Sequence, residues 1–411
     1  MQCDRTAISL FTGIGGLDLG FEAAGFSVAL AVEKDDHCRQ VLHSNRPGWQ
    51  LSTPGDVSVL TARKILRQAN LRKGEVDVLI AGPPCQPFSK SRLWVNGQAP
   101  GLRDSRAETL DHLMEMVAGT LPKVVVIENV NGISSANAGA PLRRIQSRFD
   151  QINGRFGTYY EPIAYQLNAA DYGVPQLRKR VFIIAEINGK EFVRPKPTHV
   201  PEDNLSGRKD GLVAYLNAWD AIGDLDGPQF ESSLRPTGKW AQLLPSIPEG
   251  QNYLWHTERG GGLPLFGWRT KYWSFLLKLG KHHPSWTLQA SPGPATGPFH
   301  WRNRRLTPRE MARLQTFPDS FELLDQYRET TRQIGNAVPP RLAEAVAREV
   351  MKQFFEGGVS RKFTFELPKS DAIPRRHPTR PVAIQYRNLC AAHRAHPGPG
   401  KGPRARAIAS R

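Results

Sequence analysis

Short apolar runs alternate with longer amphipathic stretches over residues 1–186, and this alternation limits the possible folds more than any other feature of the chain. Helical patterns, for example Thr61–Ala69 and Arg106–Gly119, separate several of the apolar runs. Strands that alternate with helices are joined by right-handed crossovers, so we expect an α/β fold with a doubly wound, mostly parallel sheet. Ligands of such sheets bind at the carboxyl ends of the strands. Five runs are predicted to be buried strands: Ala7–Phe11, Val28–Val32, Val76–Ala81, Val124–Ile127 and Val181–Ala185.

The strand-helix rhythm is lost between residues 187 and 304, a segment rich in Gly and Pro that carries seven of the nine tryptophans. We predict a separate, irregular domain here, in which most of the tryptophans fill a small core. Regular structure resumes at Thr307-Pro308-Arg309-Glu310, a capping box with proline at the first helical position. A second helix is expected from Pro339-Pro340 onward. The predicted division is therefore 1–186, 187–304, a return segment 305–357 that completes the first domain, and a tail 358–411.

The net charge of +17 points to a polyanionic partner, with nucleic acid as the first candidate. Residues 372–411 contribute nine Lys or Arg and no Asp or Glu, however, so much of that charge lies in a tail that we predict to be disordered. No apolar run is long enough to span a membrane, and the N-terminus does not resemble a signal peptide. The four cysteines lack paired spacing, which argues against disulfides or a metal site and favours the cytoplasm.

A glycine-rich turn follows the first predicted strand, in the sequence Phe11-Thr12-Gly13-Ile14-Gly15-Gly16. Glycines here let the backbone approach a ligand closely. Glu33 ends the second strand, where a carboxylate can accept hydrogen bonds from both hydroxyls of a ribose. Asp56, in the next turn, could accept from the amino group of an adenine. These residues fit a nicotinamide dinucleotide or S-adenosylmethionine equally well.

The most specific pattern is Gly82-Pro83-Pro84-Cys85-Gln86-Pro87-Phe88-Ser89, directly after the third predicted strand. Three prolines within five residues exclude a helix or a central strand, so Cys85 lies on a stiff loop where a thiol can act as a nucleophile. The strand Val124–Ile127 is followed by Glu128, which faces the same pocket if the two strands are neighbours. Arg178 and Arg180 alternate and would point to one side of an extended segment, where arginines can hold a base oxygen or a phosphate.

Taken in order, these motifs resemble the DNA cytosine-5 methyltransferases of bacterial restriction–modification systems over roughly residues 6–355. The resemblance rests on six segments: Phe11–Gly16, Pro83–Ser89, Glu128-Asn129-Val130, Gln176-Leu177-Arg178-Lys179-Arg180, Arg305–Glu310 and Gly335-Asn336-Ala337-Val338-Pro339-Pro340. It implies a Rossmann-like methyltransferase fold with S-adenosylmethionine as methyl donor and no metal. The inserted segment 187–304 takes the place of the family's target-recognition domain, with base-contacting residues expected within Lys278–Trp301.

The resemblance also implies a mechanism and its residues. The Cys85 thiolate would add to carbon 6 of a cytosine flipped out of the duplex, since a thiol cannot reach that atom within the base stack. Glu128 would contact and protonate ring nitrogen 3, and Arg180, with Arg178 nearby, would hold the base oxygen. The cofactor residues implied are Phe11, Gly13, Ile14, Gly16, Glu33, Asp56, Pro84, Asn336 and Val338.

The implied setting is a cytoplasmic, nucleoid-associated monomer that acts on double-stranded DNA, alongside a possible restriction endonuclease specific for the same site. Ser9 and Lys34 depart from the family pattern beside the cofactor turn, and the tail is expected to raise non-specific DNA affinity. Three alternatives remain: an RNA cytosine-5 methyltransferase, a catalytically inactive DNA-binding module and a nicotinamide oxidoreductase. The last leaves the Pro-Pro-Cys loop unexplained.

Overall fold

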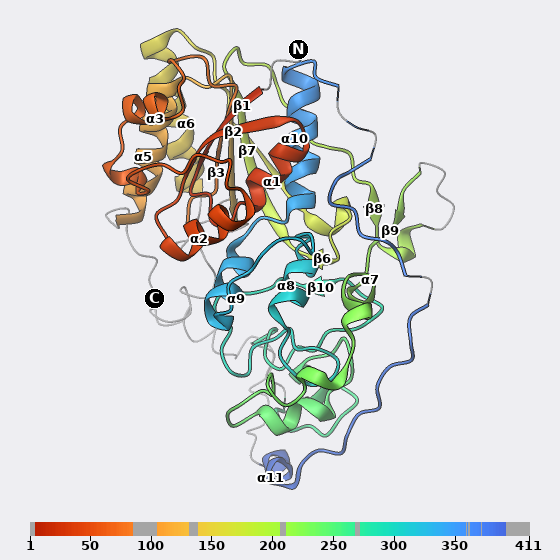
Figure 1. Cartoon of the computed structure of the whole chain (residues 1–411). Helices are drawn as coiled ribbons and strands as arrows, with labels where there is room; N and C mark the ends of the chain where they lie inside the picture. Colours follow the sequence, from red (N-terminus) through yellow and green to blue (C-terminus); the bar gives the residue numbers. More distant parts are fainter. Residues whose placement is uncertain are drawn as a thin grey trace, which may run out of the picture.

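A computed structural model describes residues 5–84, 105–130, 139–205, 211–267, 272–358, 360, 362–370 and 372–391. A six-stranded sheet with the order β2-β1-β3-β4-β7-β5 occupies the upper half of the molecule in Figure 1. β1 to β4 run parallel, and β7 is antiparallel to both of its neighbours, so the predicted mostly parallel sheet is confirmed. The strands are β1 (Arg5–Leu10), β2 (Phe26–Val32), β3 (Val78–Ala81), β4 (Val124–Val130), β5 (Ile163–Asn168) and β7 (Lys179–Glu186).

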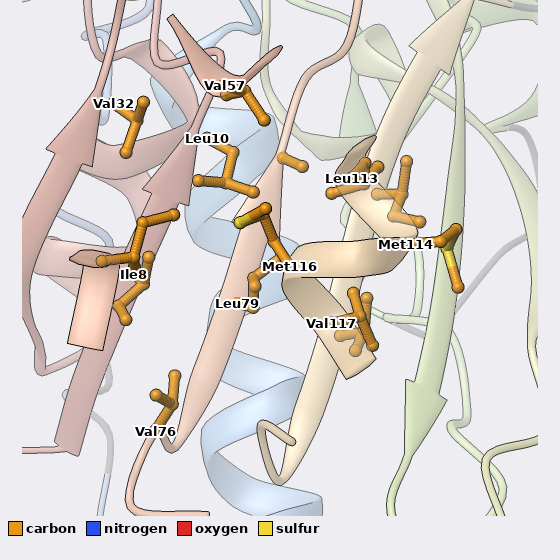
Figure 2. Close-up of a cluster of buried hydrophobic side chains, with 14 of the residues drawn as sticks. Ile8, Leu10, Val32, Val57, Val76, Leu79, Leu113, Met114, Met116 and Val117 are labelled. Atoms are coloured by element: carbon orange, nitrogen blue, oxygen red, sulfur yellow. The ribbon is translucent and has the colours of Figure 1, made fainter. Parts of the chain in front are cut away.

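Helices cover both faces of the sheet, as expected for a doubly wound fold. α3 (Ala62–Gln68), α5 (Ser105–Thr120) and α6 (Gly139–Phe156) pack on one face. Figure 2 shows this layer, in which Met116 of α5 lies over Leu79 of β3. The opposite face is covered by α1 (Gly16–Ala23) and by α10 (Pro340–Phe354), which returns from the far end of the chain. No helix in the described residues combines the length and apolar character needed to cross a membrane.

The return of α10 depends on close contact with α1. A side chain at Gly20 would bring its first carbon to 2.3 Å from the Cβ of Ala343, and one at Gly16 would come to 2.2 Å from the carbonyl oxygen of Val338. Glycine is therefore the residue that lets these two helices meet. Gly16 therefore gives the glycine-rich turn a packing role, in addition to leaving the backbone accessible to a ligand.

The predicted capping box before α8 (Pro308–Leu314) is confirmed. The Thr307 hydroxyl accepts a hydrogen bond from the Glu310 amide at 3.1 Å, and the Glu310 carboxylate accepts one from the Thr307 amide at 2.8 Å. α9 (Tyr327–Asn336) follows and leads into α10. In Figure 1, α8 and α9 lie below the sheet, between it and the irregular segment, residues 187–304.

The irregular segment contains short elements among its described residues: β8 (His199–Val200), β9 (Val213–Ala214), α7 (Ala218–Ile222), β10 (Ser285–Trp286) and several 3₁₀ turns. Trp301 is fully buried in a cluster shared with α8, and Trp240 and Trp255 pack against a second, distal cluster. These tryptophans fill cores, as predicted. Trp273 differs, because 52% of its surface is exposed.

The prediction of a disordered tail from residue 358 is wrong for the part of the tail that the structure describes. Residues 362–390, apart from 371, run along the body of the molecule and end in α11 (Ile384–Arg387) and a 3₁₀ turn. Their composition is rich in Pro and Arg, but their backbone amides bind carboxylates of the body and Tyr386 is only 3% exposed. Contacts with distant residues therefore order this segment, although its sequence has little local preference for a helix or a strand. Residues 392–411 lie outside the described part.

Candidate active site at the carboxyl edge of the sheet

The sheet register brings the predicted residues of four strands into one row. Val32, Leu10, Ala81 and Ile127 are neighbours across β2, β1, β3 and β4. The residues that follow them are Glu33, Phe11, Gly82 and Glu128. Parallel strands end at the same edge, so these four residues line one side of the sheet. A Cβ built on Gly82 would lie 3.7 Å from the Phe11 carbonyl oxygen and 3.8 Å from the Glu128 carboxylate.

Glu33 holds the glycine turn in place. Its carboxylate accepts hydrogen bonds from the Gly13 amide at 2.7 Å and from the Asp35 amide at 2.8 Å. A Cβ on Gly13 would meet nothing within 4 Å, so the turn is open on that side. Phe11 and Gly13 both have φ of 58°, which gives the turn its sharp bend. An acidic strand end beside an open backbone turn is the arrangement that can hold a ribose, so these residues fit a nucleoside cofactor.

Asp56 lies near the same strand end. A Cβ on the preceding Gly55 would come to 2.1 Å from the Glu33 carbonyl oxygen, so the two loops are in direct contact. The Asp56 carboxylate accepts from the Ser58 amide and hydroxyl at 2.9 and 2.8 Å, and Lys34 approaches it at 3.9 Å. These Ser58 hydrogen bonds outweigh partial burial and lower the pKa of Asp56. Its side chain is 43% exposed, which leaves it accessible to a ligand.

The return segment reaches this edge through α9. Arg332 binds the Asp35 carboxylate at 2.7 Å, which ties α9 to the loop after Glu33. Asn336 ends the helix one turn later and is exposed. Val338 is buried and places its carbonyl against Gly16. Ile14 is only 2% exposed and packs in the core, so its backbone alone could meet a ligand.

The proline loop is described up to Pro84, which is exposed. Cys85, the predicted nucleophile, lies outside the described residues. Its chain leaves β3 at Gly82, beside the Glu128 carboxylate.

Glu128 forms a buried ion pair with Arg180. The Arg180 Nε lies 2.9 Å from a Glu128 carboxylate oxygen, and the two side chains are each 10% exposed. Glu128 and Arg180 share a face because Val130 of β4 pairs with Arg180 of β7 in the antiparallel register. Burial raises the pKa of Glu128, and the positive charges of Arg180 and Arg178 partly oppose that change. A carboxyl group with a raised pKa and a charged partner can exchange a proton with a ligand.

Arg178 and Arg180 bind different partners, although both positive charges act on the pKa of Glu128. Arg178 lies between β6 (Gln176–Leu177) and β7, is fully buried, and donates to three backbone carbonyls. Those of Gly335 and Ala337 lie at 2.7 and 2.8 Å, and that of Leu288 at 3.3 Å. Arg178 therefore joins the return segment and the irregular segment to the sheet.

Sequence analysis missed the pairing of β10 with β6. The fully buried Gln176 supports it, donating to the Leu314 carbonyl and accepting from the Leu288 amide, both at 3.2 Å. In this short pair, Trp286 of the irregular segment lies opposite Leu177, the residue before Arg178. The one feature of the sequence that hints at this pairing is that Gln176 and Arg178 belong to the same motif.

The expectation that basic and aromatic residues within 278–301 face DNA is wrong for three of them. The side chain of Lys278 is buried and donates to the Ile247 carbonyl, and burial lowers its pKa to about 7. Lys281 pairs with Glu249 at 2.6 Å, with both side chains at most 2% exposed. Trp301 is fully buried. These residues build the segment's interior and leave other positions to meet a ligand.

Asp18, in the first turn of α1 behind the glycine turn, is fully buried. Burial raises its pKa from 3.8 to about 7. The folded protein therefore keeps a proton that the unfolded chain loses above about pH 4, and stability falls as pH rises toward 7. We expect Asp18→Asn to remove this dependence and to raise the free energy of unfolding at pH 8 by about 1–2 kcal/mol. Urea unfolding of both proteins at pH 5 and pH 8 checks this. An equal pH dependence in both would contradict it.

The doubly wound sheet, the open glycine turn and the two strand-end carboxylates define an α/β enzyme of the nucleotide-binding class. Residues 5–352 match the family described as C-5 cytosine-specific DNA methylase. The type II methyltransferase M.SacI of Streptomyces achromogenes is 36% identical over 378 residues, which cover 86% of this chain and 94% of the relative. M1.HphI of Haemophilus parahaemolyticus is 34% identical over 353 residues, covering 84% and 87%. The chain therefore belongs to the C-5 cytosine-specific DNA methylase family.

Solved structures agree on the fold. A prophage-encoded E. coli protein described as a DNA modification methyltransferase superimposes with a TM-score of 0.59 at 24% identity, covering 86% of this chain and all of that one. Spodoptera frugiperda DNMT2 gives a TM-score of 0.54 at 16% identity, covering 84% and 99%. The predicted family and fold class are confirmed. Membership implies the family's activity, methyl transfer to carbon 5 of cytosine in DNA with S-adenosylmethionine as donor.

Proposed function

We propose that the chain methylates a cytosine flipped out of double-stranded DNA, with Cys85 as nucleophile and Glu128 as the proton donor to ring nitrogen 3. The observation that carries this proposal is the buried Glu128–Arg180 pair, which lies beside Gly82 at the start of the proline loop. A pyrimidine ring bound at that carboxyl group would lie beside the start of the loop that carries Cys85. Hydride transfer by a nicotinamide oxidoreductase does not require a cysteine nucleophile next to a buried carboxyl group.

In the proposed reaction, the Cys85 thiolate forms a bond to carbon 6, the ring electrons move toward nitrogen 3, and Glu128 supplies the proton there. Breaking the aromaticity makes carbon 5 nucleophilic. S-adenosylmethionine, when bound, supplies the methyl group as an electrophilic carbon and keeps the electrons of the broken sulfur–methyl bond. A base then removes the proton from carbon 5, and the bond between Cys85 and carbon 6 breaks with its electrons returning to the Cys85 sulfur. Nitrogen 3 returns its proton to Glu128, which restores the aromatic ring.

The two arginines have different proposed roles. Arg180 would hold the base oxygen while it orients Glu128 at 2.9 Å. Arg178 would act as a positioning residue, because its guanidinium holds the carbonyls of Gly335 and Ala337 next to Asn336.

The cofactor proposal places Glu33 at the ribose and Asp56 at the adenine amine. The open side of the turn supports this, since Glu33 braces it and nothing fills the space at Gly13. Ile14 and Val338 would take part through their backbone, because their side chains are buried. The remaining proposed residues are Phe11, Gly16, Pro84 and Asn336.

The proposed biological setting is a restriction–modification system, which the printed names of the type II relatives support. Residues 187–304 would recognise the target sequence, and a restriction endonuclease of the same specificity would act separately. We propose a monomer that works in the cytoplasm on nucleoid DNA.

Covalent trapping tests the proposal. We expect the protein, with S-adenosylmethionine and duplex DNA containing 5-fluorocytosine, to form a complex that survives denaturing electrophoresis, because fluorine at carbon 5 blocks release of Cys85. Cys85→Ser should form none. Cys390→Ser is the matched control, since Cys390 is an exposed free cysteine on the tail, and it should trap normally. Trapping by the Cys85 variant would contradict the proposal. Transfer to tRNA but not to DNA in a parallel assay would favour the RNA alternative.

A further inference from the structure

A C-terminal strap, residues 362–370 and 372–390, lies beyond the family match that ends at residue 352. In Figure 1 it descends the right side of the molecule from α10, passes β8, β9 and α7, and ends in α11 at the lower end of the irregular segment. The strap therefore spans the distance between the sheet and the outermost part of the inserted segment. Its contacts fall into three groups along this path.

The first group fastens the strap to α10. The Phe363 ring lies under the guanidinium groups of Arg341 and Arg348, at 3.1 and 4.0 Å from the ring centre. The amides of Thr364 and Phe365 donate to the buried carboxylate of Glu344 at 2.8 to 3.1 Å. Hydrogen bonds to a buried charge are among the strong ones, so this end is firmly held.

The second group binds the irregular segment near its junction with the sheet. The Ser370 amide donates to Asp220 of α7 at 2.7 Å. The His377 amide donates to the Glu249 carboxylate at 2.8 Å, and the Arg375 carbonyl accepts from Lys281 at 3.3 Å. Glu249 and Lys281 form the buried ion pair described above, so the strap adds one hydrogen bond to each member of that pair.

The third group completes the distal core. Val382 and Tyr386 are two of the nine buried apolar residues in that cluster. The Tyr386 ring stacks on Trp240 with centres 5.8 Å apart, and its hydroxyl donates to the Lys239 carbonyl at 2.7 Å. A core this small has little surface to bury, so it depends on what the strap adds.

The ion pair that the strap contacts is also connected to the active edge. The backbone carbonyl of Lys281 accepts from the Trp219 amide of α7, and four residues later the chain forms β10. β10 pairs with β6, which directly precedes Arg178. The strap thus holds both the distal end of the irregular segment and the stretch that joins this segment to the sheet.

We infer that the strap is a positioning element, which fixes the irregular segment against the catalytic edge so that DNA bound by one is aligned with the other. This inference rests on the proposed target-recognition role of residues 187–304. Releasing the strap should impair productive DNA engagement and leave cofactor binding intact, because none of the three contact groups touches Glu33 or the glycine turn.

The test uses the full chain with Val382→Ala and Tyr386→Ala combined. We expect kcat/KM for DNA to fall about 10- to 100-fold, with discrimination between the target and single-mismatch sites reduced and S-adenosylmethionine affinity unchanged. The matched control is Ile384→Ala on the same helix, whose side chain is 80% exposed; it should behave as wild type. Faster amide exchange in residues 372–390 verifies release.

A second variant covers the case in which the alanine variant fails to fold. A short Gly/Ser insertion after Ile373 leaves the anchor residues intact but slackens the strap between the Ser370 and His377 contacts. Unchanged kcat/KM and unchanged discrimination in a variant with verified release would overturn the inference. Failure of the wild-type protein to methylate DNA would overturn the proposed function instead, so the two failures are distinguishable.

Discussion

Replacing Glu128 by glutamine is expected to slow methyl transfer by about 10²- to 10⁴-fold, the usual contribution of a positioned proton donor. The amide has nearly the same shape and can still accept the 2.9 Å contact from Arg180, but it has no proton to transfer to ring nitrogen 3. Single-turnover methylation of a target duplex measures the effect. S-adenosylmethionine affinity should not change, because Glu33 and the glycine turn are untouched.

Glu186→Gln is the matched control for this variant. Glu186 lies at the other end of the same antiparallel pair, opposite Val124, and is also buried. Its carboxylate binds the amides of Asn188 and Lys190, far along the strand from Glu128. We expect its rate to remain within a few-fold of wild type. A Glu128→Gln rate within about tenfold of wild type would show that the protonation of cytosine does not depend on this residue.

The residues at the sheet edge could be predicted from sequence because local patterns determine them. Alternating apolar runs place the strand ends, and a parallel sheet then gathers whatever follows those ends. This reasoning alone predicts that Glu33 and Glu128 lie at one edge of the sheet, and the strand register confirms it. The capping box at Thr307 is equally local.

The remaining features depend on contacts between residues far apart in the chain. Arg178 and Arg180 look equivalent in a five-residue motif, but Arg180 pairs with Glu128, whereas the carbonyls that hold Arg178 come from residues more than one hundred positions away. The strap was missed for the same reason. Its proline-rich, basic composition gives no periodic signal, and the Tyr386 hydroxyl binds the carbonyl of Lys239, 147 positions earlier in the chain.

Replacing Glu310 by alanine is expected to lower the free energy of unfolding by about 3–5 kcal/mol, the cost of leaving one buried charge without its partner. Arg304 and Glu310 are both fully inaccessible to solvent and share two hydrogen bonds of 2.8 and 2.7 Å. Glu310 also caps α8 through the Thr307 amide. Burial and the charge of Arg304 lower the pKa of the neighbouring His300, and an imidazole cannot supply the negative charge that Arg304 loses.

Denaturant unfolding of Glu310→Ala measures this loss, with Asp319→Ala as the matched control. Asp319 pairs with Arg313 at 2.6 Å, but its side chain is 58% exposed, so its removal should cost about 1 kcal/mol or less. The combined Arg304→Met and Glu310→Met variant separates the two physical causes. If the unpaired charge is what destabilises the single variant, replacing both partners by apolar side chains should restore most of the stability. A double variant as unstable as Glu310→Ala would mean that the lost cap and packing, and not the buried charge, hold α8 against the irregular segment.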